Sequence, residues 1–194
     1  MAQPFAPALQ FPPELLLKAQ GPGSGIRAAI FDVDGVLTDG RLFIGERGEA
    51  FKAFHVLDGH GLKLLAQGGI TPVIVTGRDS PAVRRRIADL GLQHAYFGVS
   101  DKLAVADQLC LDLGIDWPQL AVIGDDWPDL PLLQRAGFAC APATAHAEAR
   151  ALAHHVTRAR GGEGAAREFC DLLLMACGRY AALLQGQLAT LDAR

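Results

Sequence analysis

From Ile26 onward, short apolar runs alternate with longer segments in which apolar residues recur every three or four positions. Four or five apolar residues bounded by glycine or polar residues predict a buried strand, and the longer spacing predicts an amphipathic helix. Strands that alternate with such helices form a parallel sheet covered on both faces. The expected strands are Ala28–Asp32, Pro72–Thr76, His94–Phe97, Ala121–Gly124, Gly137–Cys140 and Ala153–Val156. We therefore predict an α/β fold with a doubly wound, Rossmann-like parallel sheet.

The expected helices have recognisable ends. Ser80 is a typical N-cap, and Gly91 ends the helix that follows it. A second helix follows Ser100 and stops at Gly114, because glycine readily takes the left-handed conformation of a helix end. A last helix, apolar on more than one side, is expected over about 163–188.

The chain divides into a short N-terminal segment and a single domain. Residues 1–25 contain five prolines and end in Gly-Pro-Gly-Ser-Gly, which indicates a flexible tail with one turn of helix around Glu14–Gln20. Residues 26–194 are expected to form the domain. Its one irregular insert, at about 40–56, consists of β-prone runs Arg41–Ile44 and Ala50–Val56 joined by a glycine-rich turn.

The hairpin expected at this insert forms a small cap with bulky side chains on both faces. A hairpin that is apolar on both sides is not stable as a solvent-facing flap. We therefore expect it to pack on the domain or on another subunit, and a cap this small leaves the substrate to be enclosed by a neighbouring subunit.

Composition excludes several classes of protein. The 194 residues are 50% hydrophobic and carry a net charge of −3, which argues against disorder and against a nucleic-acid binder with a basic face. No apolar run approaches the length of a membrane span, and the first positive charge comes too late for a signal peptide. Four cysteines without C-x-x-C spacing indicate reduced thiols, so we expect a cytoplasmic protein.

Polar residues follow each of the expected central strands. Ligands of open α/β sheets bind outside the carboxyl ends of the strands, where these side chains would meet. The candidate site residues are Asp32, Asp34, Thr76, Gly77, Arg78, Lys102, Asp125 and Asp126.

The acidic residues at this edge predict a metal ion. Two like charges 4 Å apart repel each other by about 4 kcal/mol at an effective dielectric constant of about 20. Carboxylate and carbonyl oxygens favour a hard cation such as Mg²⁺. We expect Asp32, the main-chain carbonyl of Asp34 and Asp125 to hold the ion, with Asp126 supporting it from outside. Asp129 is expected either to brace the loop or to take part.

A nucleophilic carboxylate beside a metal predicts phosphoryl transfer through an aspartyl phosphate. Asp32 is the expected nucleophile. Asp34 is the expected general acid for the leaving oxygen and then the base for water. We expect Thr76 and the amides near Gly77 to bind phosphate oxygens, and Lys102 to neutralise charge.

These residues resemble the motifs of the haloacid dehalogenase-like hydrolase superfamily. The chain carries its motifs in order as Asp32-Val33-Asp34-Gly35-Val36, Thr76-Gly77-Arg78, Lys102 and Gly124-Asp125-Asp126 followed by Asp129. The resemblance covers about 26–177. It implies the α/β fold and the phosphatase chemistry described above.

Further segments resemble the family of 3-deoxy-D-manno-octulosonate 8-phosphate phosphatases. They are Asp39-Gly40 before the hairpin, Asp58-Gly59-His60-Gly61-Leu62, and the glycine-rich segment from Gly161 to Arg167. This resemblance implies a Mg²⁺-dependent enzyme of lipopolysaccharide precursor synthesis. It also implies a homotetramer in which hairpins and tails help to close neighbouring sites.

One position departs from that family. Leu57 stands where many relatives carry Arg before the Asp-Gly pair, so Arg78 or Arg167 would have to hold the sugar carboxylate. The departure leaves open a nine-carbon sialic-acid-like sugar 9-phosphate or another small sugar phosphate as substrate.

Two hypotheses from different functional classes compete with a phosphatase. A phosphoacceptor signalling domain also combines acidic residues, a threonine and a lysine, but it would carry its acidic pair before the phosphorylated Asp. An oligomer with an inactive site conflicts with the intact polar residues at the sheet edge.

Overall fold

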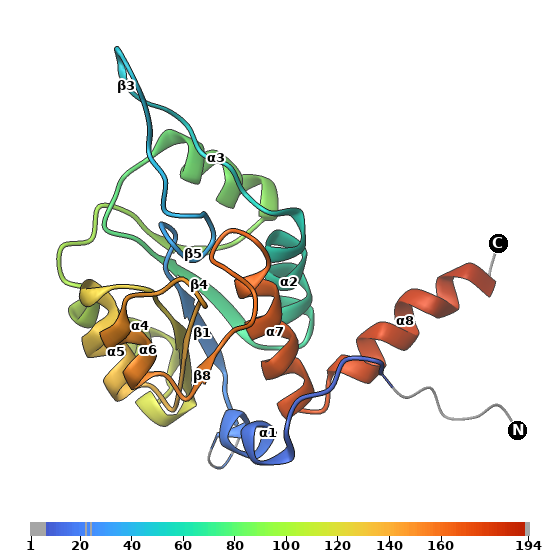
Figure 1. The fold of residues 1–194 in the computed structure, drawn as a ribbon. Coiled ribbons are helices and arrows are strands. Elements are labelled where there is room, and N and C mark those ends of the chain that lie inside the picture. Colours follow the sequence, from blue (N-terminus) through green and yellow to red (C-terminus); the bar gives the residue numbers. More distant parts are fainter. Residues whose placement is uncertain (1–6, 22, 24, 193–194) are drawn as a thin grey trace, which may run out of the picture.

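The computed structural model describes residues 7–21, 23 and 25–192, and its centre is a six-stranded parallel sheet (Figure 1). The order across the sheet is β5-β4-β1-β6-β7-β8, and every pairing is parallel. The strands are β1 (Ala28–Phe31), β4 (Thr71–Val75), β5 (His94–Tyr96), β6 (Leu120–Ile123), β7 (Phe138–Ala141) and β8 (His155–Val156). The predicted doubly wound α/β fold is thus confirmed.

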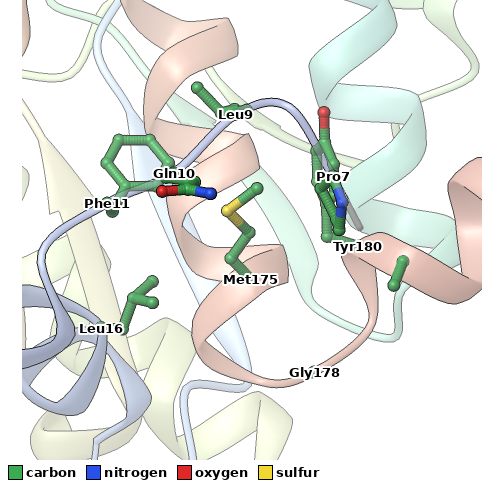
Figure 2. A pocket seen from close by; sticks show the side chains of 9 residues that line it. Pro7, Leu9, Gln10, Phe11, Leu16, Met175, Gly178 and Tyr180 are labelled. Atoms are coloured by element: carbon green, nitrogen blue, oxygen red, sulfur yellow. The ribbon is translucent and has the colours of Figure 1, made fainter. Parts of the chain in front are cut away.

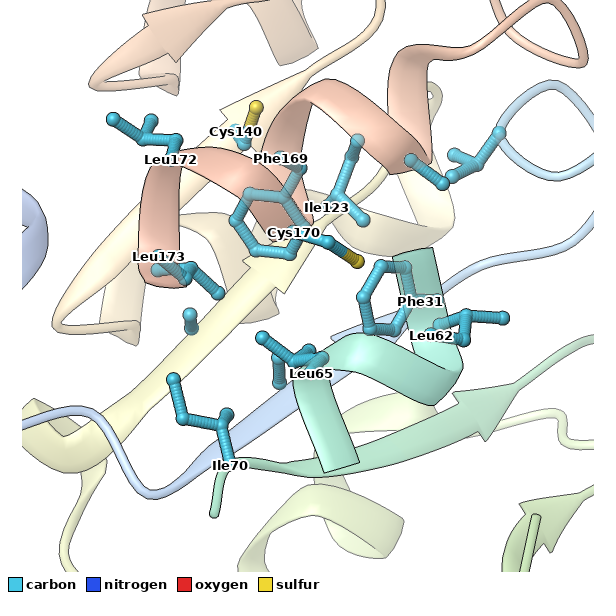
Figure 3. Close-up of a cluster of buried hydrophobic side chains, with 14 of the residues drawn as sticks. Phe31, Leu62, Leu65, Ile70, Ile123, Cys140, Phe169, Cys170, Leu172 and Leu173 are labelled. Carbon is cyan, nitrogen blue, oxygen red and sulfur yellow. The ribbon is translucent and has the colours of Figure 1, made fainter. Parts of the chain in front are cut away.

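The central strands are buried on both faces, as continuous apolar runs require. Alternate residues of β1 point to opposite sides of the sheet: Phe31 belongs to one hydrophobic cluster and Ile30 to the other. Figure 3 shows the first cluster, in which Phe31 meets the edge of Phe169 with ring centroids 5.4 Å apart. Two cores therefore hold β1 in place from both sides.

Helices cover both faces of the sheet. The face of Phe31 is covered by α1 (Pro13–Gln20), α2 (Val56–Gln67), α3 (Pro81–Leu90) and α7 (Ala165–Ala176). The face of Ile30 is covered by α4 (Lys102–Leu113), α5 (Leu130–Arg135) and α6 (Ala147–Leu152). Single turns of 3₁₀ helix occur at Trp117–Gln119 and Trp127–Asp129.

The helix ends follow the sequence signals closely. Ser80 caps α3 by accepting a hydrogen bond from the Val83 N–H at 3.4 Å, and Gly91 ends α3 at a φ of 71°. The cap of α4 is Asp101, the residue after Ser100, and its carboxylate accepts from the Ala104 N–H at 3.1 Å. The first residue of α4 is consequently Lys102.

The N-terminal segment contains the expected helix, and that helix is packed. α1 spans Pro13–Gln20 and buries Ala19. Phe11, Leu15 and Leu16 pack against the cluster that contains Phe31. None of the helices in the described ranges has the length and apolar character that crossing a membrane requires.

The insert forms a hairpin, but its second strand is shorter than predicted. β2 (Phe43–Gly45) pairs with β3 (Gly48–Phe51), and the expected strand up to Val56 is wrong because α2 begins at Val56. Gly59 made α2 hard to recognise, since glycine weakens helices. Gly59 lies close to α3, where a Cβ would meet the Arg86 guanidinium and lie 3.0 Å from the Leu90 side chain.

The single helix predicted over about 163–188 is also wrong. The chain forms α7 and a separate α8 (Tyr180–Asp192), and between them Gly178 takes a φ of 71°, which ends a helix. Figure 1 shows α8 extending away from the sheet.

Candidate active site

The first two acidic positions follow β1 at the carboxyl edge of the sheet. Asp32 is buried, and its carboxylate accepts a hydrogen bond from Lys102 Nζ at 2.7 Å. The same ammonium donates to Asp129 Oδ1 at 2.7 Å. Lys102 sits at the start of α4, where the helix dipole disfavours a cation. The carboxylates of Asp32 and Asp129 offset this unfavourable interaction with the helix dipole.

The loop after β1 leaves space for the carboxylate of Asp125. Gly35 has a φ of 95°, and a Cβ there would lie 2.0 Å from Asp125 Oδ2. Only glycine offers both this backbone conformation and the space for the carboxylate. Asp125 comes from the end of β6, so the loop after one strand cradles a side chain that follows its neighbour.

Crowding of these acidic groups changes their protonation. Burial raises the pKa of Asp125 to about 8, and the charges of Asp32, Asp129 and Asp126 add to the effect. Burial and the charge of Asp129 raise the pKa of Asp32 to about 6, although Lys102 opposes the change. Burial alone would lower the pKa of Lys102, but the charges of Asp32 and Asp129 outweigh it and raise the pKa.

For Asp129, the sequence left open whether it braces the loop or takes part in the site. Its carboxylate is buried, and it accepts hydrogen bonds from Lys102 and from the backbone N–H of Asp125 at 3.1 Å. Asp126 is exposed, and its own backbone N–H donates to Asp129 at 3.4 Å. The third carboxylate beside Asp32 and Asp125 therefore belongs to Asp129. The supporting role of Asp126 stays a prediction.

The second motif lies at the end of β4. Thr76 is buried, and its Oγ1 accepts from the Arg78 N–H at 3.4 Å. Gly77 is exposed beside it. The Arg78 guanidinium lies 3.7 Å from Asp34 Oδ2 and 3.6 Å from Glu49 Oε2. Arg78 and Asp34 therefore share one rim of the site.

The hairpin contributes two charged residues that sequence reasoning missed. Lys52 Nζ contacts Asp34 Oδ1 and lies 3.2 Å from Glu49 Oε2. Glu49 in turn accepts a hydrogen bond from the Ser80 hydroxyl. Burial alone would raise the pKa of Glu49, but the hydrogen bonds from Ser80 and Lys52 lower it. No motif marked these residues, because the pairing depends on how the hairpin folds back.

Arg167 lies apart from this cluster. Its Nε donates to both oxygens of Asp171 at 2.8 Å along α7, and its backbone N–H donates to the buried Asp58 at 2.8 Å. Leu57 is half exposed and lines a cavity that also touches Arg167. A substrate contact by Arg167 stays a prediction.

The acidic residues fit a divalent cation. One carboxylate oxygen each from Asp32, Asp125 and Asp129 lies within 4.8 Å of the other two. With Lys102, the fully ionised group carries a net charge of −2. The raised pKa values of Asp32 and Asp125 reflect the cost of ionising both groups together, a cost that a bound cation would offset. Oxygen ligands and this charge suit Mg²⁺.

The described cavities do not coincide with these carboxylates. Figure 2 shows a hollow of about 340 Å³ between the N-terminal segment and the junction of α7 with α8. Its lining includes Leu9, Phe11, Met175 and Tyr180. The candidate site instead lies at the carboxyl ends of β1, β4 and β6, where Asp32, Thr76 and Asp129 are buried.

An Asp-x-Asp after β1, a threonine after β4, a helix-start lysine and an aspartate after β6 define a haloacid dehalogenase-like hydrolase. The family model of that description matches residues 96–169. A 3-deoxy-D-manno-octulosonate 8-phosphate phosphatase from Yersinia pestis is 44% identical over 153 residues, which cover 79% of this chain and 82% of that protein. The chain belongs to the family of these phosphatases.

Solved structures agree with this placement. A phosphatase of the YrbI family from Pseudomonas syringae pv. phaseolica has a TM-score of 0.85 at 46% identity and covers 90% of this chain and 97% of its own. The phosphatase from Moraxella catarrhalis, solved with a magnesium ion, a phosphate ion and a KDO molecule, has a TM-score of 0.83 at 39% identity. It covers 89% of this chain and 97% of its own.

Proposed function

We propose that the protein is a Mg²⁺-dependent phosphatase that hydrolyses 3-deoxy-D-manno-octulosonate 8-phosphate to the free sugar acid and phosphate, a step that supplies lipopolysaccharide synthesis. The observation that carries the proposal is the group of Asp32, Asp125 and Asp129 around one point, joined by Lys102. The names of the relatives from Yersinia pestis and Moraxella catarrhalis support the choice of substrate.

The first step is attack on phosphorus by Asp32. Its oxygen forms a bond to phosphorus while the bond to the sugar oxygen breaks and leaves its electron pair on that oxygen. Asp34 donates a proton to this oxygen, so that the sugar leaves as an alcohol. Lys102 stays beside Asp32 and offsets the negative charge of the phosphoryl group.

The second step releases phosphate. Asp34, now ionised, takes a proton from a water molecule as its oxygen attacks phosphorus. The bond from phosphorus to Asp32 breaks and returns the carboxylate. A Mg²⁺ ion held by Asp32, the main-chain carbonyl of Asp34 and Asp125, with Asp129 beside them, would act as a Lewis acid that offsets charge on the phosphoryl oxygens.

Phosphate and sugar contacts are proposed for residues of the same rim. The Thr76 hydroxyl and the Gly77 amide would bind phosphoryl oxygens, and Arg78 would face the sugar acid. Arg78 is half exposed beside Asp34, which supports this role. Arg167 would serve the carboxylate only if it released Asp171.

A panel of sugar phosphates, assayed for phosphate release with Mg²⁺ and with EDTA, tests the proposal. We expect the eight-carbon ulosonate phosphate to be the best substrate and EDTA to abolish turnover. Preference for a nine-carbon sugar 9-phosphate would move the assignment to that substrate. Turnover that persists in EDTA would contradict the metal-dependent mechanism.

We further propose that the protein assembles as a homotetramer in the cytoplasm. Ile44 and Phe51 of the hairpin are more than half exposed in the single chain, which supports burial against another subunit. Three of the four free cysteines are buried, and reduced thiols suit that compartment. Sedimentation analysis should give four chains for the wild type and fewer for Phe51→Ser.

A further inference from the structure

The contact between Lys52 and Asp34 links the hairpin to the catalytic acid. Lys52 directly follows β3, and its side chain is only 1% exposed. Its ammonium contacts Asp34 Oδ1 and lies 3.2 Å from Glu49 Oε2. A buried ammonium is costly unless it is paired, so both carboxylates are needed to keep it there.

The partners of Lys52 are themselves fixed. The other oxygen of Glu49 accepts from the hydroxyl of Ser80, which also caps α3. A chain of polar contacts thus runs from the start of α3 through Glu49 and Lys52 to Asp34. This chain anchors the base of the hairpin to the main domain.

The two oxygens of Asp34 have different surroundings. Oδ1 is taken by Lys52, whereas Oδ2 is buried and has no hydrogen-bond partner. The Arg78 guanidinium, at 3.7 Å from Oδ2, is too far for a hydrogen bond. One oxygen is therefore held by Lys52, whereas the other faces the half-exposed Arg78 without a hydrogen bond.

We propose that Lys52 is a positioning residue for Asp34: it holds Oδ1 and directs Oδ2 toward the leaving oxygen of the substrate. The inference rests on the proposed phosphatase function and on the acid role of Asp34 within it. The hairpin then has a catalytic purpose, because the segment that directly follows it delivers the residue that orients the acid.

The leaving group of the substrate provides the test. A sugar phosphate releases an alcohol that needs a proton, whereas p-nitrophenyl phosphate releases a phenolate that does not. We expect Lys52→Met to lower kcat for the sugar phosphate by about 100-fold, within the usual range for general acid catalysis, and for the aryl ester by less than about tenfold. An equal loss with both esters would overturn the proposal.

A double variant separates positioning from an independent role. If Lys52 acts through Asp34, the variant with both Asp34→Asn and Lys52→Met should match Asp34→Asn alone on the sugar phosphate. Losses that multiply would overturn the proposal. Lys63→Met, at an exposed lysine of α2, is the matched control and should keep wild-type kcat.

Two measurements keep the result interpretable. Lys52→Met should melt at a lower temperature than the wild type, because Asp34 and Glu49 lose their cation, but it should stay folded at the assay temperature and match the wild type in Mg²⁺ titration, which shows that the site is intact. If that variant unfolds, Glu49→Gln provides a second test, because it removes a charged partner of Lys52. This variant should show the same preference for the aryl ester, to a smaller extent. Absence of that preference would overturn the proposal. A wild-type enzyme that hydrolyses neither ester would refute the proposed function instead.

Discussion

At the residue scale, the site consists of carboxylates that repel one another until a cation binds between them. Asp125 shows this most clearly, because burial and neighbouring charges raise its pKa to about 8. The folded protein without metal then holds a proton that the unfolded chain has already lost at pH 7. Folding without metal therefore favours the protonated form of this carboxyl group, whereas metal binding requires the ionised form.

The protonation of Asp125 gives a prediction for stability. Because its pKa is raised on folding, the carboxyl group favours the folded state below about pH 4 and disfavours it as the pH rises toward 8. Without metal, Asp125→Asn should therefore unfold at a higher temperature than the wild type at pH 8, and the difference should shrink toward pH 4. Thermal melts in EDTA across this range measure the effect.

The same substitution should abolish the benefit of the cation. Mg²⁺ should raise the melting temperature of the wild type and leave that of Asp125→Asn unchanged. An Asn variant that Mg²⁺ stabilises as strongly as the wild type would exclude Asp125 as a ligand.

Gly35 gives a second prediction at this scale. Gly35→Ala places a methyl group where the Asp125 carboxylate lies, on a backbone with a φ of 95°. We expect a loss of about 1–3 kcal/mol in the free energy of unfolding from backbone strain. Mg²⁺ affinity should also fall, which calorimetric titration would show. Gly48→Ala, also at a positive φ but with open space around it, should leave Mg²⁺ affinity unchanged.

At the element scale, the sequence predicted the sheet well because its strands are continuous apolar runs with polar residues after them. The motif residues were found for the same reason, since Asp32, Thr76 and Asp125 each follow such a run. α2 was missed because its glycines serve close packing. Lys52 and Glu49 were missed because their partners are distant in the sequence.

Asp58 joins α2 to the start of α7, and its substitution tests how much this link contributes to stability. This buried carboxylate of α2 accepts from the backbone N–H groups of Gly164 at 3.3 Å and Arg167 at 2.8 Å, and so caps the first turn of α7. Asp58→Ala should cost about 1–2 kcal/mol in the free energy of unfolding. Denaturant titration checks this, with the exposed Asp112→Ala expected to have a much smaller effect. Equal effects would mean that the cap contributes nothing.

At the scale of the whole molecule, the fold gathers residues from four separate segments at the carboxyl edge of the sheet. The loop after β1 also packs under the glycine-rich turn before α7: a Cβ at Gly161 would lie 1.7 Å from the Gly35 carbonyl oxygen. The loop that carries Asp34 is thereby fixed to the far end of the chain. The hairpin extends furthest beyond α3 at this end of the molecule (Figure 1).

Binding of inorganic phosphate, measured by calorimetry with and without Mg²⁺, tests whether a divalent cation is what lets this acidic site accept an anion. In a buffer above pH 8, where Asp125 has lost its proton, the carboxylates of Asp32, Asp125 and Asp129 should repel the anion when no cation is present, because they outnumber Lys102. Phosphate should bind in Mg²⁺ and show no measurable binding in EDTA. Binding of equal affinity under both conditions would contradict this expectation.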